Sequence, residues 1–148
     1  LFQKAPVRPK VRYYEGIVGI RDMYANILRE KNLKEYQIIA SEDAWLRMDR
    51  PFFQDFKRKR AKAGIKTRLI LEYGPEALKR KRQERETNSR IKILPKNFPW
   101  EFSSEVSIFE HKVVFIAYKG PLIGVEVQSA EIAKQQHAIF EYLWGVVK

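Results

Sequence analysis

Polar and aromatic side chains follow three of the β-favouring runs in this chain of 148 residues. Tyr14 and Glu15 end the first run, Ser41 follows the second, and Glu72 and Tyr73 follow the third. In open α/β sheets, ligands bind outside the carboxyl ends of parallel strands. Such a set of hydroxyl, carboxylate and aromatic groups suits a polar small ligand, for example a sugar or a nucleotide fragment. Three of these residues also have a purely structural interpretation, Ser41 as a helix N-cap and Glu72 and Tyr73 as turn surface.

The run Glu110-His111-Lys112 is a further candidate. Either Lys112 joins the same ligand cleft, or the run forms an exposed hairpin turn. The two histidines, His111 and His137, are too few and too far apart for a metal motif. The chain has no cysteine, which excludes thiolate metal sites, cysteine nucleophiles and disulfides, and it has no Gly-rich phosphate loop. A carboxylate site for magnesium stays open, but we predict no cofactor and no bound metal.

Two runs of basic residues give the chain its excess of positive charge. With 29 Lys and Arg against 18 Asp and Glu, the formal net charge is +11. A basic field attracts nucleic acid phosphates. Four consecutive cations on one helix point in all directions, however, so a solvated helix face is the favoured interpretation and nucleic acid binding is the alternative. The residues of that alternative are Lys57, Arg58, Lys59, Arg60, Lys79, Arg80, Lys81 and Arg82.

Length and composition predict one folded domain. The chain is 45% hydrophobic and has 9 Phe, 7 Tyr and 3 Trp, enough for a substantial core. No apolar run approaches the length of a membrane span, and there is no signal-peptide pattern, so we expect no membrane partner and a cytoplasmic location. Residues 1–10 contain two prolines and are predicted to be a linker or tail, with the domain over residues 11–148.

Hydrophobic periodicity predicts alternating strands and helices in the first half of the chain. Ser41 is a plausible N-cap, Pro51 should divide the following helical segment in two, and Gly64 should end it. The predicted strands are 11–14, 35–40, 65–71 and 90–94, and the predicted helices are 17–32, two segments over 42–63, and 75–86.

The second half has a different texture. Three strand-like runs with short turns, over 106–109, 113–118 and 122–127, predict an antiparallel meander. A last helix from Ser129 is expected to bury Ile132, Ile139 and Phe140, among others. Parallel strands with crossover helices, followed by this meander, give an α/β fold: a single domain with one mixed β-sheet flanked by helices.

The order and spacing of several segments resemble the C-terminal domain of TrmB-type transcriptional regulators. The segments are Val-Arg-Tyr-Tyr-Glu-Gly (11–16), Arg-Ala-Lys-Ala-Gly-Ile-Lys-Thr-Arg (60–68), Ile-Gly-Val-Glu-Val-Gln-Ser-Ala-Glu-Ile-Ala (123–133) and Phe-Glu-Tyr-Leu-Trp (140–144). The resemblance implies a phospholipase D-like fold that follows an N-terminal winged helix-turn-helix. A helix-turn-helix needs about three helices. Because only ten residues precede Val11, we expect that unit to lie outside this chain, which would then be an excised domain.

The resemblance also allows a residue-by-residue comparison with the phospholipase D motif, which reads H-x-K, four residues, D, six residues, G-S, two residues, N. Lys112 and Gly124 match its Lys and Gly. Strand alternation would turn His111 to the opposite face. A carboxylate at the position of the nucleophilic His would repel the phosphodiester anion. The positions that do not match are Glu110, Ala117, Val125 and Gln128, so we predict a non-catalytic domain.

We therefore expect a ligand-sensing and dimerisation domain of a transcriptional regulator. The partners implied by the resemblance are a second copy of the chain, a small polar effector such as a sugar or phosphorylated metabolite, and DNA contacted through the helix-turn-helix. Phe98 and Trp100 lie in one loop, where they belong either to a dimer interface or to the core of the domain. The alternatives are a basic nucleic acid-binding module and, ranked lower, a degenerate phosphodiesterase.

Overall fold

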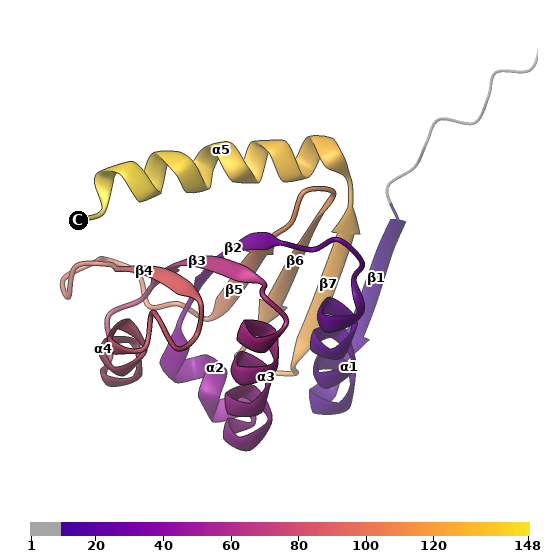
Figure 1. The fold of residues 1–148 in the computed structure, drawn as a ribbon, viewed down its shortest axis with the longest axis horizontal. Helices are drawn as coiled ribbons and strands as arrows, with labels where there is room; N and C mark the ends of the chain where they lie inside the picture. The colour runs from indigo at the N-terminus through magenta and orange to yellow at the C-terminus, as the bar shows by residue number, and fades with distance from the viewer. Residues whose placement is uncertain (1–9) are drawn as a thin grey trace, which may run out of the picture.

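The structure, a computed structural model that describes residues 10–148, is built on one sheet of seven strands (Figure 1). The strand order across the sheet is β1-β7-β6-β5-β2-β3-β4. The predicted α/β fold with a mixed sheet is therefore confirmed. Residues 1–9, most of the predicted linker or tail, lie outside the described residues. The strands are β1 (Lys10–Glu15), β2 (Glu35–Ala40), β3 (Lys66–Leu71), β4 (Ser89–Ile93), β5 (Ser104–Ile108), β6 (Lys112–Ala117) and β7 (Ile123–Gln128).

Five helices cover the two faces of the sheet, four on one face and one on the other. The first four are α1 (Gly16–Arg29), α2 (Glu42–Met48), α3 (Arg50–Lys62) and α4 (Pro75–Arg82), and the fifth is α5 (Ala130–Val146). None of these helices is both long and apolar enough to cross a bilayer.

The local signals in the sequence act as predicted around α2 and α3. The Ser41 hydroxyl accepts a hydrogen bond from the Ala44 N–H at 3.1 Å and so caps α2. Pro51 lies in the first turn of α3, where its missing N–H costs nothing, and α3 ends just before Gly64 at a φ of +79°. The helix α4 is shorter than predicted, because residues 83–88 form turns that lead into β4.

The parallel strands β2, β3 and β4 and the antiparallel strands β5, β6 and β7 pair as predicted. The predicted parallel pairing of the first-half strands is wrong for β1, which pairs antiparallel with β7 at the far edge of the sheet, because β5 occupies the free side of β2. Packing of α1 supports this arrangement. A Cβ at Gly124 of β7 would lie 3.0 Å from Met23 Sδ and 3.2 Å from Ile20 Cδ1, so glycine lets α1 approach β7 closely.

Strand alternation divides the core into two clusters. The larger lies under α1–α4 and includes Tyr24, Tyr36 and Phe53, whereas the smaller lies under α5 and is centred on Phe140. The predicted burial of Ile132 and Ile139 is wrong, because their side chains are 37% and 50% exposed. The helix α5 is apolar on two sides, and its sequence periodicity alone does not show which side meets the sheet.

In the loop before β5, Phe98 and Trp100 have different surroundings. Phe98 is half-buried and packs against Phe102, with 6.1 Å between the ring centroids, so it belongs to the cluster under α5. Trp100 remains 73% exposed. Of the two alternatives for this loop, folding back over the domain thus holds for Phe98 alone.

Candidate functional site

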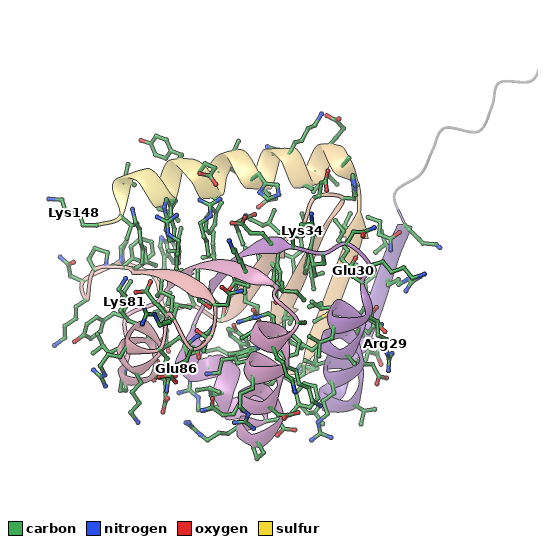
Figure 2. The ribbon with its side chains drawn as sticks, viewed as in Figure 1. Arg29, Glu30, Lys34, Lys81, Glu86 and Lys148 are labelled. Atoms are coloured by element: carbon green, nitrogen blue, oxygen red, sulfur yellow. The ribbon has the colours of Figure 1, made fainter. Side chains whose placement is uncertain are left out.

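Lys112, the residue that matches the Lys of the phospholipase D motif in sequence, lies at the start of β6 and is held between two carboxylates. Lys112 Nζ is 2.9 Å from Glu30 Oε1 and 3.3 Å from Glu126 Oε1, and it sits 4.9 Å from the ring centroid of Phe109. Glu30 comes from the end of α1, close to the start of β2, as Figure 2 shows with Arg29 and Lys34. The cation that would hold a phosphate is therefore already neutralised within the fold.

The Asn position of the motif is also engaged by a carboxylate. Gln128 lies directly opposite Lys112 in the β6–β7 ladder, and its Nε2 donates to Glu126 Oε2 at 3.1 Å. The Glu126 side chain is only 6% exposed. Arg12 Nε also lies 4.0 Å from Glu126 Oε2, so two cations and two carboxylates balance here. Lys112 therefore has no uncompensated positive charge with which to hold an anionic phosphodiester.

Glu110 and His111 form the tip of the turn between β5 and β6. The Phe109 N–H donates to the Lys112 carbonyl at 2.9 Å, and both turn residues are exposed. The expectation that strand alternation points His111 to the opposite face is wrong, because these two residues are not in a strand. They border a hollow of about 480 Å³ together with Lys31. Glu110, at the position of the nucleophile, offers a carboxylate in place of an imidazole.

The predicted ligand cleft is divided between opposite edges of the sheet. The pairing of Lys112 with Gln128, and of Gln128 with Lys10, places Lys112 at the amino ends of the parallel strands. The expectation that Lys112 joins the other ligand candidates is therefore wrong. Those at the carboxyl edge are Tyr14, Glu15, Ser41, Glu72 and Tyr73.

Even at the carboxyl edge the candidates do not form one group. Three strands separate the end of β1, with Tyr14 and Glu15, from the end of β2. Ser41 has the structural role of a cap and is 2% exposed. Glu72 accepts a hydrogen bond from the Phe102 N–H, and Tyr73 is 41% exposed.

A hollow of about 440 Å³ opens beside Glu72. Arg47 of α2 and Lys119 of the β6–β7 loop line it, together with Glu101 and Tyr118. It combines two cations, two carboxylates and an aromatic ring, and none of these residues except Glu72 was a sequence candidate. They come from loops and helices whose mutual position depends on the sheet order.

Three of the eight cations proposed for nucleic acid binding are buried, which overturns their assignment. Lys57, Arg60 and Arg80 are 4%, 1% and 1% exposed. Lys57 and Arg60 continue the helical stripe of Phe53 and Phe56, at positions that face the sheet. The spacing of these four residues could have predicted their burial from the sequence, but the run of consecutive cations drew attention to charge instead of periodicity. The five that remain on the surface are Arg58, Lys59, Lys79, Lys81 and Arg82.

The buried cations belong to a charge cluster that sequence reasoning missed. Glu42 at the start of α2 accepts from Lys57 Nζ at 2.9 Å, and Arg80 Nη1 lies 3.2 and 3.1 Å from its two oxygens. Burial alone would raise the pKa of Glu42, but the charges of Arg80 and Lys57 outweigh burial and hold the pKa below its ordinary value. Glu42 thus ties α2 to α3 and α4.

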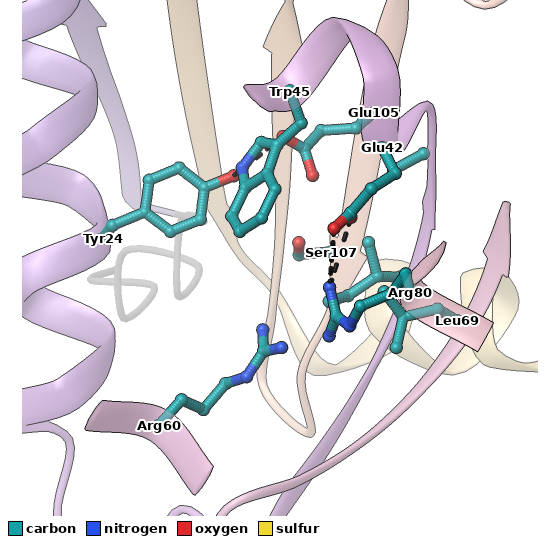
Figure 3. A pocket seen from close by; sticks show the side chains of 10 residues that line it. Tyr24, Glu42, Trp45, Arg60, Leu69, Arg80, Glu105 and Ser107 are labelled. Carbon is teal, nitrogen blue, oxygen red and sulfur yellow. Dashed lines mark hydrogen bonds and ion pairs between the residues drawn. The ribbon is translucent and has the colours of Figure 1, made fainter. Parts of the chain in front are cut away.

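A second buried carboxylate, Glu105 of β5, lies on the same side of the sheet (Figure 3). Tyr24 donates its hydroxyl proton to Glu105 Oε1 at 2.7 Å, and Trp45 Nε1 donates to the Tyr24 hydroxyl at 2.8 Å. Burial raises the pKa of Glu105 to about 7, against the hydrogen bond from Tyr24. Arg60 Nη1 donates to the Tyr36 hydroxyl at 2.9 Å. Across residues 10–148, no group of three His, Asp or Glu side chains is placed to hold a metal ion.

The seven-stranded mixed sheet and the five helices on its two faces form a phospholipase D-like fold. Comparison with solved structures confirms it. Nuc from Salmonella typhimurium, a phospholipase D family member, matches with a TM-score of 0.70 and 13% identity over 95% of this chain and 97% of its own. NucT from Helicobacter pylori matches with a TM-score of 0.63 and 12% identity over 95% and 98%.

The same fold occurs in TrmBL2, an archaeal chromatin protein described as showing a novel mode of DNA binding. It matches with a TM-score of 0.61 and 16% identity over 99% of this chain. This chain spans 55% of the length of TrmBL2. The resemblance to TrmB-type proteins is thus supported at the level of the fold. No family model and no curated protein sequence matches the chain.

Proposed function

We propose that this chain is a non-catalytic regulatory domain that pairs with a second copy and responds to a small polar effector. The observation that carries the proposal is the neutralisation of Lys112 by Glu30 and Glu126, with Glu110 at the position of the nucleophile. A domain of this fold whose motif lysine is already paired with carboxylates, and whose nucleophile position holds a glutamate, is not equipped for phosphodiester cleavage. What remains is a rigid sheet with surfaces for partners.

The absence of cleavage is tested with a chromogenic phosphodiester and the full chain. We expect no hydrolysis above the buffer rate, and no difference between the wild type and Lys112→Ala. Hydrolysis by the wild type that Lys112→Ala abolishes would overturn the non-catalytic assignment.

The part of the sheet that α5 leaves uncovered supports pairing with a second copy. In register across the sheet, Tyr13 lies opposite Val125, Val125 opposite Phe115, and Phe115 opposite Val106. Tyr13 is 72% exposed and Phe115 39%. An antiparallel sheet with one solvated face normally places polar residues outward, yet most outward positions here are apolar, and Glu15, opposite Ile123, is a charged exception at the edge. We call this surface the open sheet face: Val11, Tyr13, Val106, Phe115, Ile123, Val125 and Val127.

A second apolar surface lies on α5, on the side turned away from its own sheet. Ile132, Ile139, Tyr142 and Val146 recur at spacings of 7, 3 and 4 and are 37%, 50%, 75% and 58% exposed. We call these four residues the outer stripe. No charged residue interrupts them, although 32% of the chain is charged. Large exposed apolar patches of this kind mark interaction sites.

Two copies facing each other can cover both surfaces at once. On each copy, α5 packs along one face of the sheet over β2, β5 and β6, and β1 lies beside it without a covering helix on that face (Figure 1). A two-fold axis would lay each outer stripe on the partner's open sheet face, so that the same pair of surfaces is used twice. A stable interface should bury more than ~1,000 Å² in total.

Light scattering at micromolar concentration tests this dimer. We expect the mass of two chains for the wild type and of one chain for Tyr142→Glu and for Phe115→Glu. Gln83→Glu adds the same charge on the exposed end of α4 and should remain dimeric. A single-chain mass for the wild type, or a dimer that both variants leave intact, would contradict the proposal.

The effector is best placed in the hollow beside Glu72. Arg47, which has no ion-pair partner among the described residues, faces it together with polar groups and with Lys119, whose Nζ lies 3.9 Å from Glu101 Oε2. The free guanidinium of Arg47 suits a sugar phosphate or a similar small anion carrying hydroxyls. A ligand that binds only the folded state raises the unfolding midpoint. We expect a phosphorylated sugar to raise it in the wild type and not in Arg47→Ala. A rise that Arg47→Ala and Lys119→Ala both retain would place the effector elsewhere.

A basic surface at the amino edge of the sheet supports a second candidate function, contact with nucleic acid. Six exposed cations gather where the chain enters β2, β3 and β4, and none has an ion-pair partner among the described residues. Such cations displace counterions from phosphates and make binding depend steeply on salt. The six are Lys31, Lys34, Lys62, Lys66, Arg85 and Arg90.

Fluorescence anisotropy with duplex DNA at several salt concentrations tests this candidate. The double variant Lys34→Gln and Lys66→Gln should weaken binding and reduce the salt slope by about 2. Its matched control, Arg58→Gln and Lys59→Gln, removes two exposed cations that already pair with Asp55 and should have a smaller effect. Equal effects of the two variants would dismiss the amino edge as a specific surface.

A further inference from the structure

A small cavity lies between the sheet and the helices α1–α4, and every residue that lines it is buried. Its walls include the side chains of Glu42, Arg60, Arg80, Glu105 and Ser107 (Figure 3). The space open to the centre of a water-sized sphere is about 10 Å³. A single small guest of one atom fits such a cavity, and a phosphate or a carboxylate does not.

The guanidinium of Arg60 has donors that nothing in the described fold satisfies. Arg60 is 1% exposed, and its Nη1 donates to the neutral hydroxyl of Tyr36. Its Nε and Nη2 have no hydrogen-bond partner among residues 10–148. The guanidinium lies 5.7 Å from the ring centroid of Tyr36 and 5.4 Å from that of Phe56, but these contacts provide no acceptor for the two N–H groups. Buried donors without an acceptor are unfavourable, so a guest that accepts from Arg60 would stabilise the folded state.

The buried cluster also carries an excess of positive charge. Lys57, Arg60 and Arg80 give +3, and Glu42 and Glu105 give −2 when both are ionised, which leaves +1. Glu42 is shared by Lys57 and Arg80, so Arg60 is the cation without a carboxylate. Proton uptake by Glu105 would raise the excess to +2.

The two arginines reach the cavity from different helices, and their guanidinium groups point toward each other in Figure 3. Burial of Arg80 lowers the pKa of its guanidinium, and the charge of Arg60 lowers that pKa further. Two like charges inside one closed space repel each other unless a negative charge lies between them. A neutral water molecule would accept hydrogen bonds there but would leave the charge uncompensated.

We propose that this cavity binds one small inorganic anion of halide size, which accepts hydrogen bonds from Arg60 and Arg80 and lies beside the Ser107 hydroxyl. The anion supplies the negative charge that the protein lacks at this point, and it joins α3 and α4 to the sheet. The site is separate from Lys112, from the hollow beside Glu72 and from the dimer surfaces, so it does not depend on the proposed function.

Thermal unfolding of the full chain at constant ionic strength is the first test. Sodium chloride or sodium bromide should raise the unfolding midpoint in a saturable way relative to sodium gluconate, whose anion is too large for the cavity. We expect a rise of about 4 °C at ten times the dissociation constant. Arg60→Met should lose this dependence, whereas Arg58→Met, two residues away and exposed, should keep it.

A crystal structure of the wild type grown in bromide is the second test, and it holds whether or not Arg60→Met folds. An anomalous peak between Arg60 and Arg80 would support the site. A cavity that is empty or filled by water without anomalous signal, at a bromide concentration that saturates any thermal shift, would overturn it. An equal halide effect in Arg58→Met and Arg60→Met would overturn it as well.

Discussion

The two faces of the sheet differ in what they bury and in what they leave to solvent. Under α1–α4, a continuous aromatic core encloses three cations and two carboxylates, with Trp45, Phe53 and Phe56 around them. Under α5, the core is smaller, and apolar side chains such as Tyr13 and Phe115 remain at the surface. One face therefore holds charge where water does not reach, and the other exposes apolar groups to water.

Each face points to a different kind of partner. We call the side of the sheet under α1–α4 the covered face and the side that carries α5 the open face. On the covered face, Arg60 has no carboxylate partner, and on the open face, exposed apolar side chains have no surface to pack against. The free energy of folding is a small difference between large terms, so neither deficit is negligible. The variants below test how differently the two faces contribute to stability.

The largest loss is expected on the covered face, from Glu42→Gln. This change leaves Lys57 and Arg80 buried without their shared carboxylate, which costs about 3–5 kcal/mol for such pairs. Urea unfolding measures it. Glu110→Gln, on the exposed turn, should stay within about 0.5 kcal/mol of the wild type. A loss below about 1 kcal/mol for Glu42→Gln would show that the cluster does not depend on this carboxylate.

On the open face, the two sides of α5 should behave differently. Phe140→Ala removes a fully buried ring and should cost about 3–5 kcal/mol, because the cavity it leaves is only partly filled by relaxation. Tyr142→Ala, on the outer stripe, should change the unfolding free energy of the isolated chain by less than about 0.5 kcal/mol. The comparison needs a protein concentration at which the wild type is monomeric. Similar losses for both variants would mean that the outer stripe packs within its own domain.

The covered face should also make stability depend on pH through Glu105. Its pKa is raised from 4.5 to about 7 in the folded state, so the folded state holds this proton more tightly than the unfolded state does. The contribution of Glu105 is therefore complete below pH 4.5, falls as the pH rises to about 7, and then levels off. The expected change is about 3 kcal/mol.

Unfolding measured from pH 5 to pH 8 in the wild type and in Glu105→Gln isolates this effect. The groups that face Glu105 are Tyr24, Tyr118, Glu42 and Arg60. The pKa values of both tyrosines are raised and that of Glu42 is lowered, so none of these three groups titrates over that range. We expect the variant to lose most of the decline. A wild type whose stability rises with pH over this interval would contradict the assignment.

The smallest losses in unfolding free energy are expected from removing one helix N-cap on each face of the sheet. Ser41 accepts from the Ala44 N–H at 3.1 Å, and Ser129 accepts from the Ile132 N–H at 3.2 Å. Replacement of either by alanine should cost about 1 kcal/mol in urea unfolding. Ser41→Ala should cost somewhat more, since that cap is buried. The reverse order would show that α5 depends more on its cap than on the sheet beneath it.

Helix ends and strand bounds, which depend on neighbours a few positions away, could be predicted from the sequence. Ser41, Pro51 and Gly64 predicted where α2 and α3 begin and end, because caps and backbone restrictions act within about one turn. The bounds of β2 were predicted without error, and so was the change from parallel to antiparallel strands.

Strand order, burial of charges and ion pairs between distant elements could not be predicted from the sequence and required the tertiary structure. It placed β1 beside β7, buried Arg60 and Arg80, and brought Glu30 next to Lys112. It also determined which apolar side of α5 meets the sheet. The physical reason is that burial and pairing of charges depend on the order of strands across the sheet, and that order is set by the packing of the whole chain rather than by local preference.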